Sequence, residues 1–403
     1  MAGDGAKAAS RDRAGRYVRQ ATGYRAFIPA PLPPSAPPLQ LDAEMLALLS
    51  RADRSLGRLD GSIQTLPDAD LFVSMYVRKE AVLSSQIEGT QSSLDDLLAV
   101  EAELFSPNTP RDVDEVLNYV GAMNHGLARL PELPVSVRLV RELHERLLHD
   151  VCGSERNPGQ IRTSQNWIGP GGASLSEAAF VPPPAHEVPQ ALGDWERFLH
   201  AELPLPVLVR IGLAHAQFET IHPFLDGNGR VGRLLLTLLL YERKVLGRPV
   251  LYLSHYFKRH RARYYEALQA VRDDGAWEAW ISFFLTAVGE VAEEATQTAR
   301  RIVELRERHR ALVARETGRA AGAGLLVLES LYSRPIVTAG DVARLTGTTA
   351  AAARQLVSRF EAAGVLREIT GYTRNRRFRY DEYVRIFSED DPPPGGEPPG
   401  AGA

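Results

Sequence analysis

The twelve residues from His222 to Arg233, HPFLDGNGRVGR, combine side chains and glycines that suit phosphate chemistry. Their core, GNGRVG, spells G-x-G-x-x-G, but dinucleotide binding also needs a strand before the glycines and an acid about 20 residues after them. Here the end of an amphipathic helix and a proline-bearing loop, QFETIHPFLD, precede the glycines, and the segment LYLSHY around Tyr252 offers no acid. No Lys-Ser or Lys-Thr follows, so the sequence excludes a Walker loop as well.

The same glycines lead into an apolar helical segment, RVGRLLLTLLLYERK. The first backbone N–H groups of a helix have no partner inside it, so this start predicts an anion site with phosphate as its natural ligand. Gly227 and Gly229 let the backbone approach the anion closely. Arg230 and Arg233, three residues apart, leave the same helix face near its positive end. Because the segment is apolar on every face, we expect it to be buried.

Two further side chains complete a reactive set. Asp226 directly precedes the glycines and is a hard oxygen ligand placed to hold Mg²⁺ against a polyphosphate. His222 is the general base in reach, with an ordinary pKa of about 6.5. Together these residues predict transfer of a phosphorus group from a nucleoside triphosphate to a hydroxyl that the histidine deprotonates. The alternative, a helix cap with a structural histidine, is less favoured for the set as a whole.

At every defined position these twelve residues match the signature of the Fic family, His-Pro-Phe-x-Asp/Glu-Gly-Asn-Gly-Arg-x-x-Arg. The chain resembles that family over most of Tyr24 to about Val288, through pieces such as AHAQFETI, RYYEAL, WEAWISFFL, PGQIR and VPPP. The resemblance implies a protein adenylyltransferase that transfers AMP from ATP to a Ser, Thr or Tyr hydroxyl of a target protein, or of itself, and releases pyrophosphate.

The resemblance also implies roles by position. It makes His222 the base, Asp226 the Mg²⁺ ligand and Phe224 a buried anchor of the loop. The expected ATP-binding residues are Gly227, Asn228, Gly229, Arg230 and Arg233, the last toward the γ-phosphate. One departure concerns the nucleoside: relatives commonly carry Asn-Arg before a Tyr-Tyr pair, whereas His260 and Arg261 precede Tyr264 and Tyr265 here. The base preference therefore stays open.

A second motif, SSQIEG, predicts a brake. Ser84 and Glu88 lie four apart on one helix face, and Gly89 can end that helix. The motif resembles the inhibitory Ser/Thr-x-x-x-Glu-Gly/Asn of Fic proteins that carry it on an N-terminal helix. The resemblance implies that the Glu88 carboxylate pairs with Arg233 where the γ-phosphate must bind. By itself the short motif also fits an ordinary exposed Ser and Glu.

The length of 403 residues, with 44% hydrophobic residues, allows one large core and a smaller domain. We expect a mainly α fold: a Fic-type helical bundle with a small β-hairpin flap between Asn157 and Pro184, and a C-terminal winged helix-turn-helix domain. In relatives the flap pairs with the main chain of the target, which carries little sequence information. The Pro-rich segment after Tyr24 predicts an extended arm or a disordered linker. The expected division is a disordered tail (1–20), an N-terminal arm and helical region with the inhibitory helix (21–110), a Fic catalytic core (111–300), a linker helix (301–324), the winged helix-turn-helix (325–387) and a second disordered tail (388–403).

In the C-terminal domain, TAAAARQLVSRFEAAG is the expected recognition helix, and a basic run follows it. Either DNA or a protein could be its partner. The wing arginines suited to phosphate are Arg374, Arg376, Arg377 and Arg379, and the residues offered to base edges are Arg354, Gln355 and Arg359.

The composition limits the other functions. A net charge of -3 provides no global field toward nucleic acid or membrane. The single cysteine, Cys152, excludes an internal disulfide and is expected to be a small core residue. No segment reaches the roughly 18 apolar residues of a membrane span, so we expect a cytoplasmic protein, with a homodimer left open. The alternative functions are a nucleotide-sensing DNA-binding transcriptional regulator, against which the intact His222 and Asp226 argue, and transfer or removal of another nucleotide or phosphate group.

Overall fold

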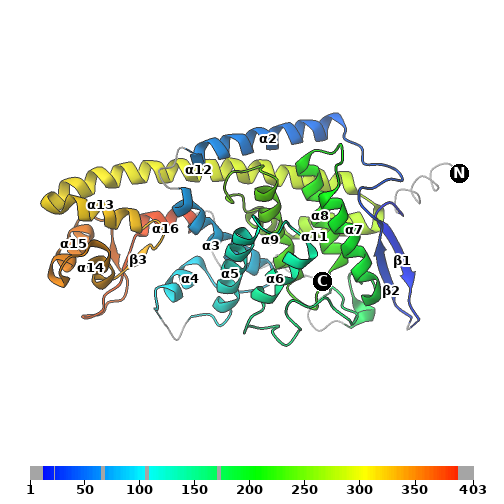
Figure 1. Ribbon diagram of the computed structural model, residues 1–403, viewed down its shortest axis with the longest axis horizontal. Helices are drawn as coiled ribbons and strands as arrows, with labels where there is room; N and C mark the ends of the chain where they lie inside the picture. Colours follow the sequence, from blue (N-terminus) through cyan, green and yellow to red (C-terminus); the bar gives the residue numbers. More distant parts are fainter. Residues whose placement is uncertain (1–11, 22, 65–68, 105–108, 170–173, 389–403) are drawn as a thin grey trace, which may run out of the picture. The chain divides into compact units, whose positions relative to one another are not determined.

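The computed structural model describes residues 12–21, 23–64, 69–104, 109–169 and 174–388 (Figure 1). Helices prevail among them, with two small antiparallel sheets, so the mainly α class is confirmed. The chain divides into two compact units, and each is described by itself. The first comprises Met1–Thr65, Tyr76–Ser93 and Asn108–Ala295, and the second Leu66–Met75, Leu94–Pro107 and Thr296–Ala403. No helix in the described part of the chain is both long enough and apolar enough to cross a membrane.

The first unit is a helical bundle with a β-hairpin at its N-terminal end (Figure 1). Its elements are β1 (Gly15–Arg19), β2 (Arg25–Pro29), α2 (Ala43–Gln64), α5 (Val113–Arg129), α6 (Val137–Leu147), α7 (Val188–His200), α8 (Val207–Ile221), α9 (Asn228–Glu242), α10 (Ser254–Arg259) and α11 (Arg261–Asp274). Two other helices, α3 (Ala69–Ile87) and α12 (Trp277–Thr317), have residues in both units.

The core of this unit forms around α8, which packs against α7, α9 and α11. Small residues let large neighbours approach its backbone. The indole N–H of Trp195 donates to the Ala214 carbonyl at 2.9 Å, and that of Trp280 donates to the Gly212 carbonyl at 2.8 Å. Helix α9 is buried along nearly its whole length, as its all-round apolar sequence predicts. The loop between α8 and α9 is therefore held by two interior helices.

Helix α3 is fastened to this core by a buried carboxyl group. Glu80 accepts hydrogen bonds from the Tyr119 hydroxyl at 3.1 Å and the Ser254 hydroxyl at 2.5 Å. Burial raises the pKa of Glu80 to about 7, against the lowering effects of Ser254 and Arg233. Tyr119 belongs to α5 and Ser254 to α10, so Glu80 ties α3 to both helices.

The N-terminal region corrects part of the predicted tail. Residues 1–11 lie outside the described residues, but Gly15–Arg19 forms β1, which pairs with β2. The strand forms because the ring of Tyr17 packs against that of Phe27, with centroids 5.0 Å apart, and Phe27 is buried. Beyond β2 the chain follows the body as an extended arm, since the Gln217 amide donates to the Ala30 carbonyl at 2.8 Å.

The flap is smaller than expected. It has one antiparallel bridge, in which Ile168 and Phe180 exchange backbone hydrogen bonds of 2.9 and 3.1 Å, and a short 3-10 helix at Leu175–Glu177. Residues 170–173, within the predicted flap, lie outside the described residues. The interruption between helices is thus confirmed, but its described part has no hairpin longer than this bridge.

The second unit contains several helices and a three-stranded antiparallel sheet in the order β3-β5-β4. Its elements are α4 (Leu94–Glu101), α13 (Ala321–Ser330), β3 (Ile336–Val337), α14 (Ala339–Thr346), α15 (Ala350–Ala362), β4 (Arg367–Glu368), β5 (Phe378–Arg379) and α16 (Asp381–Ser388), of which α13, α14 and α15 precede the β4–β5 hairpin. A capping box of Thr338 and Asp341 begins α14, and Gly347, at φ 64°, ends it. The order agrees with the expected winged helix-turn-helix, whose assignment stays a prediction.

Two predicted boundaries differ from the structure. Helix α12 continues unbroken to Thr317 because no proline interrupts it, so no separate linker helix begins at residue 301. Residues 94–107, expected in the N-terminal region, belong to the second unit, where Asp95 pairs with Arg379 at 2.8 Å. The predicted tail beyond residue 388 lies outside the described residues.

Candidate active site

The loop between α8 and α9 has left-handed backbone at both ends. His222 caps α8 at φ 49° and ψ 62°, and its N–H donates to the Phe218 carbonyl at 3.0 Å. Gly227, at φ 71°, precedes α9. A positive φ suits glycine but is uncommon for other residues. Such strain persists where the surrounding structure holds it, and it often marks a functional site.

Donors from outside the motif hold the carbonyl groups of this loop. The guanidinium Nε of Arg162 donates to the His222 carbonyl at 2.9 Å, and its backbone N–H donates to the Pro223 carbonyl at 2.9 Å. The Asn166 amide donates to the Phe224 carbonyl at 2.7 Å. Arg162 and Asn166 come from the segment that leads into the flap, so this segment also positions His222.

His144 holds the other end of the loop. The Gly159 N–H donates to its Nδ1 at 2.8 Å, which places the ring proton on Nε2, 3.0 Å from the Asp226 carbonyl. Its ring stacks on the buried Phe224 ring, with centroids 3.7 Å apart. Burial lowers the pKa of His144 to about 4, so the ring is neutral near pH 7. Phe224 is the buried anchor that the resemblance implies.

The side chain of Asn228 does not have the expected role of a phosphate contact. Its side-chain oxygen accepts from the Phe224 N–H at 2.8 Å, and its amide donates to the Phe224 carbonyl at 2.9 Å. The side chain therefore closes the loop. What Asn228 offers an anion is its backbone N–H at the start of α9.

The start of α9, where an anion cradle is predicted, has backbone amides that no carbonyl of the turn accepts. The first N–H to bond to a carbonyl of the turn is that of Val231, which donates to the Gly227 carbonyl at 3.0 Å. The Gly227 N–H is taken by the Asp226 carboxylate at 2.5 Å. The cradle thus consists of the amides of Asn228, Gly229 and Arg230, one residue further along than expected.

A cavity of about 390 Å³ opens over this cradle. Cys152, expected in the core, is exposed and lines it. The lining residues are Glu88, Gly89, Thr90, Asp112, Glu115, Cys152, His222, Leu225, Asp226, Gly227, Asn228, Gly229 and Arg230.

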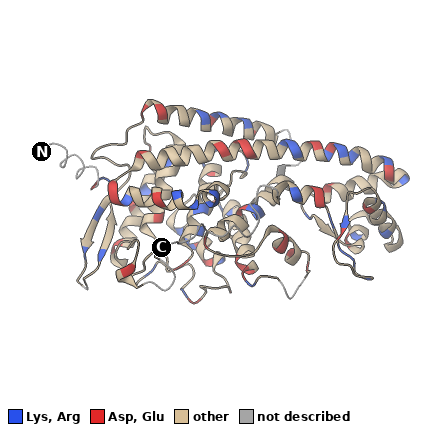
Figure 2. Cartoon of the chain, turned by 180° about the vertical axis from the view of Figure 1, so that it is seen from behind, with Lys and Arg blue, Asp and Glu red and all other residues tan. Residues whose placement is uncertain are grey.

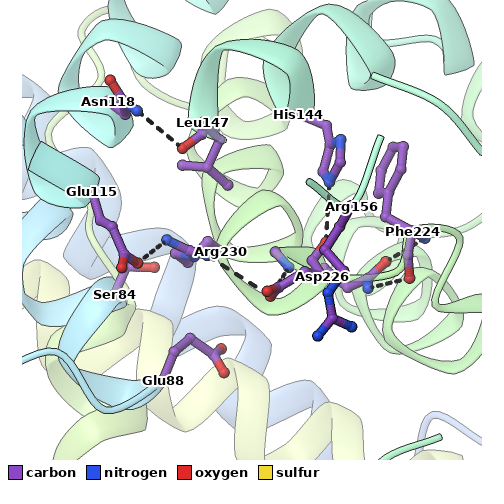
Figure 3. Close-up of polar contacts among 12 residues, drawn as sticks. Ser84, Glu88, Glu115, Asn118, His144, Leu147, Arg156, Phe224, Asp226 and Arg230 are labelled. Atoms are coloured by element: carbon purple, nitrogen blue, oxygen red, sulfur yellow. Dashed lines mark hydrogen bonds and ion pairs between the residues drawn. The ribbon is translucent and has the colours of Figure 1, made fainter. Parts of the chain in front are cut away.

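Arg230 lies between two carboxylates (Figure 3). Its Nη1 donates to Glu115 Oε2 at 2.6 Å, and its Nη2 lies 3.9 Å from Asp226 Oδ1. Its Nε has no hydrogen-bond partner among the described residues, although the side chain is buried. Burial and the neighbouring charges of Asp112 and Asp226 raise the pKa of Glu115, against the lowering effect of Arg230. Glu115 thus fixes the guanidinium while leaving it donors for a ligand.

Arg233 is held by the predicted inhibitory motif. Its Nε donates to the Ser84 hydroxyl and its Nη2 to the Ser84 carbonyl, both at 2.9 Å. The same Nη2 donates to Glu88 Oε1 at 2.6 Å. Burial acts to raise the pKa of Glu88, but the charge and hydrogen bond of Arg233, together with the charge of Arg230, lower it overall. The ion pair that the resemblance implies is therefore present, and Gly89, at φ 110°, follows the end of α3.

Glu88 also lies directly against the cradle. A Cβ atom added to Gly229 would collide with Glu88 Oε1 and come within 2.9 Å of Arg233 Nη1. The carboxylate thus takes up the space above the first turn of α9.

The protonation state of His222 differs from expectation. Burial lowers its pKa to about 3, and the charges of Arg272 and Arg162 lower it further, whereas Glu88 acts in the opposite sense. The imidazole is therefore neutral at physiological pH. The expectation of about 6.5 used an isolated histidine, and it was wrong because the folded chain removes water from the ring.

Comparison with known proteins identifies two matching regions of the chain. Residues 46–128 match the Fic/DOC family N-terminal description, and residues 134–240 match the Fic/DOC family. A probable protein adenylyltransferase of Aquifex aeolicus is 28% identical over 204 residues, which cover 50% of this chain and 57% of that protein. The protein adenylyltransferase Fic of Drosophila melanogaster is 27% identical over 187 residues, which cover 46% of this chain and 34% of that protein.

The fold is also similar to a crystal structure of a Fic family protein from Desulfovibrio desulfuricans. That match has a TM-score of 0.57 at 21% identity and covers 85% of this chain and 98% of the other. Fold and loop together define a helical protein with a glycine-containing loop that leads into a buried helix. Residues 46–128 and 134–240 are therefore the N-terminal and main parts of a Fic domain.

Proposed function

We propose that this protein is a protein adenylyltransferase that transfers AMP from ATP to a Ser, Thr or Tyr hydroxyl of a protein, and that its own Glu88 restrains the reaction. The observation that carries the proposal is one cavity that holds a neutral His222, the amide cradle of α9 and the Glu88 carboxylate. The relatives named as protein adenylyltransferases support the activity, although the chain spans only 57% and 34% of their lengths.

In the proposed reaction His222 takes the proton from the attacking hydroxyl. The hydroxyl oxygen forms a bond to the α-phosphorus of ATP, the bond from that phosphorus to the bridging oxygen breaks, and pyrophosphate leaves. The amides of the cradle and the guanidinium groups of Arg230 and Arg233 stabilise the phosphate charge. A pKa of about 3 makes the free imidazole a weak base, but a bound triphosphate adds negative charge, which raises the pKa of a neighbouring histidine.

Asp226 fits the role of a magnesium ligand. One carboxylate oxygen accepts the Gly227 N–H at 2.5 Å, and 43% of the side chain is exposed. The described residues contain no cluster of three or more His, Cys, Asp or Glu suited to a metal. Mg²⁺ commonly binds one or two carboxylates together with substrate phosphates and water. When bound, it would neutralise charge on the phosphate chain.

The brake follows from the position of Glu88. The carboxylate occupies a donor of Arg233 and the space above Gly229, both of which the triphosphate requires. ATP can bind productively only when Glu88 leaves. Arg233 keeps both of its hydrogen bonds to Ser84 whether or not Glu88 is paired with it, so the guanidinium stays in place.

Labelled nucleotides test the activity. With [α-³²P]ATP and Mg²⁺, the Glu88→Gly protein should label itself or an added protein, whereas [γ-³²P]ATP should give no label. The Glu88→Gly/His222→Ala protein should bind ATP and transfer nothing. Incorporation of the γ-label would show phosphate transfer instead of AMP transfer. Labelling only from UTP would show that UTP, and not ATP, is the nucleotide donor.

A second proposal concerns the C-terminal unit. We infer that its winged helix can bind DNA through the arginines that have no partner among the described residues. Arg359 donates to the Thr317 carbonyl at 2.7 Å, and Arg376 pairs with Glu361 at 3.0 Å. Arg379 is also paired, with Asp95. Fewer arginines are therefore available to contact DNA than the sequence suggests. The exposed residues left for phosphate or bases are Arg354, Gln355 and Arg374. If duplex DNA added to the protein in a salt titration shows no binding at low salt, this role is lost.

We also propose a cytoplasmic location, which the single cysteine supports because it requires no oxidising compartment.

A further inference from the structure

The β1–β2 hairpin contains several arginines (Figure 2). Residues 12–29 contain four arginines and one acidic residue in a chain whose net charge is -3. One of the four, Arg13, is buried and pairs with Glu278 at 2.8 Å. The side chains of the other three are exposed and form neither a hydrogen bond nor an ion pair with any described residue, although Arg25 lies over the Tyr17 ring at 5.4 Å; the three are Arg16, Arg19 and Arg25. We call Gly15–Pro29 with these three side chains the arginine hairpin.

The register places two of these cations opposite each other. Arg19 pairs with Arg25, and the hydrogen bond from the Gln20 N–H to the Tyr24 carbonyl, 2.8 Å, lies one residue away. Hydrogen-bonded and non-hydrogen-bonded pairs alternate, so Arg19 and Arg25 form the non-hydrogen-bonded pair, in which side chains are closer. Like charges directly opposite destabilise a hairpin. An anion between them would remove this repulsion.

The outer edge of β1 is free for pairing. The sheet has only β1 and β2 among the described residues, and the register directs the backbone N–H and C=O groups of Tyr17 and Arg19 away from β2. The other edge is used, because the Phe27 N–H donates to the Val181 carbonyl at 2.9 Å. An open edge can add an extended segment, while charges along it select against unsuitable partners.

The arginine hairpin adjoins the flap and, through it, the helix that ends at His222. The rings of Phe27 and Phe180 lie 6.0 Å apart, and Arg272 stacks over Phe180 at 3.9 Å. Arg272 also donates to the Glu219 carbonyl at 3.1 Å, in the last turn of α8. A protein segment on the hairpin would therefore lie beside the elements that position the proposed base.

We propose that the arginine hairpin is a docking surface for an acidic, extended segment of a protein substrate. That the segment belongs to a substrate rests on the proposed function, whereas its binding to the hairpin does not. A peptide matches this surface better than a nucleic acid, because its backbone supplies both the donors and the acceptors that the edge of β1 leaves unpaired. Glutamates and aspartates of the segment would lie between the opposed arginines.

Fluorescence anisotropy with two model peptides tests the docking. One is a labelled peptide of alternating Glu and Val around a single Tyr, and the other has Lys in place of Glu. The whole chain should bind the Glu peptide at least tenfold more tightly than the Lys peptide, and the difference should shrink between 50 and 200 mM salt, about as expected for exposed charges. The Arg19→Glu/Arg25→Glu protein should lose at least tenfold in affinity for the Glu peptide. The Arg51→Glu/Arg54→Glu protein, with the same charge change on α2, should bind like the parent.

Transfer gives an independent readout. In the Glu88→Gly background, the Arg19→Glu/Arg25→Glu change should raise the KM for the Glu peptide while kcat and ATP affinity stay the same. Equal affinity for both peptides in the parent, an equal loss in the α2 control, or stronger competition by a single-stranded oligonucleotide than by polyglutamate would each overturn the docking surface. If the Glu88→Gly protein transfers nothing yet the peptide affinities follow the expected order, only the proposed function fails.

Discussion

Replacing Glu88 by glycine removes the proposed inhibitory carboxylate and leaves the other residues of the site unchanged. In the folded chain the carboxylate bonds to Arg233 at 2.6 Å; the arginine side chain is 1% exposed and that of Glu88 is 37% exposed. A hydrogen bond to a charged group contributes about 1.5 to 3 kcal/mol, and screening of the partly exposed carboxylate reduces this to about 1 to 2 kcal/mol. Since 1.4 kcal/mol corresponds to a factor of ten, productive ATP binding should rise about 5- to 30-fold.

The same change has a cost in the absence of nucleotide. Arg233 loses a partner, so the free energy of unfolding should fall by about 1 to 2 kcal/mol and Tm by a few degrees. MgATP at about 100 times its Kd should return about 2.7 kcal/mol. Thermal shift and labelling with [α-³²P]ATP should therefore show a variant that is less stable than the parent alone and gains more stability from MgATP.

Two controls make the result interpretable. Glu88→Gln keeps the size and an oxygen acceptor but removes the charge, so its labelling should fall between the parent and Glu88→Gly. Glu88→Gly/His222→Ala should show the thermal shift without label. Equal labelling and equal MgATP shifts in the parent and Glu88→Gly would refute the inference that this ion pair blocks the site.

Three further outcomes follow from the same geometry. Asp226→Asn keeps the acceptor for Gly227 but removes the charge, so calorimetry should show ATP binding that depends less on Mg²⁺; an unchanged magnesium titration would remove Asp226 as a ligand. Glu115→Gln, in the Glu88→Gly background, should lower kcat without raising the Kd for ATP, because Arg230 keeps its charge but loses its fixed position. A lower kcat together with a higher Kd would indicate structural damage instead. The pKa of His222 is about 3 in the folded chain and about 6.5 when unfolded, so the unfolded state binds the extra proton between these values and stability falls as the pH falls. Urea unfolding from pH 7 to pH 5 should therefore cost the parent about 2 kcal/mol more than His222→Asn, and parallel pH profiles of the two proteins would contradict the depressed pKa.

The amino-acid sequence by itself determines the reactive loop. The twelve residues from His222 to Arg233 are contiguous, and the chemistry of a helix start that follows two glycines depends on local backbone alone. For the same reason the buried character of α9 could be predicted from its own residues. The pairing of Glu88 with Arg233, 145 residues apart, was implied only by the resemblance, because the short motif by itself also fits an ordinary exposed Ser and Glu.

Only the tertiary structure decided how the loop is held. His144, Arg162 and Asn166 were missed, since a histidine in LHERLL or an arginine in PGQIR has no spacing that ties it to a loop about 60 to 80 residues later. The loop has carbonyl groups that need donors, but its sequence does not say which donors reach them. PGQIR was part of the resemblance, and it was the one available signal for Arg162.

Burial likewise depends on the whole fold. The pKa of His222 falls because neighbouring segments exclude water from the ring, and the Asn228 side chain turns inward because Phe224 presents both a donor and an acceptor to it. The pairing of Arg230 with Glu115 joins two helices that no local pattern relates. Residue types and their order specify which groups can react, whereas solvation and the direction of each side chain arise only when distant segments pack together.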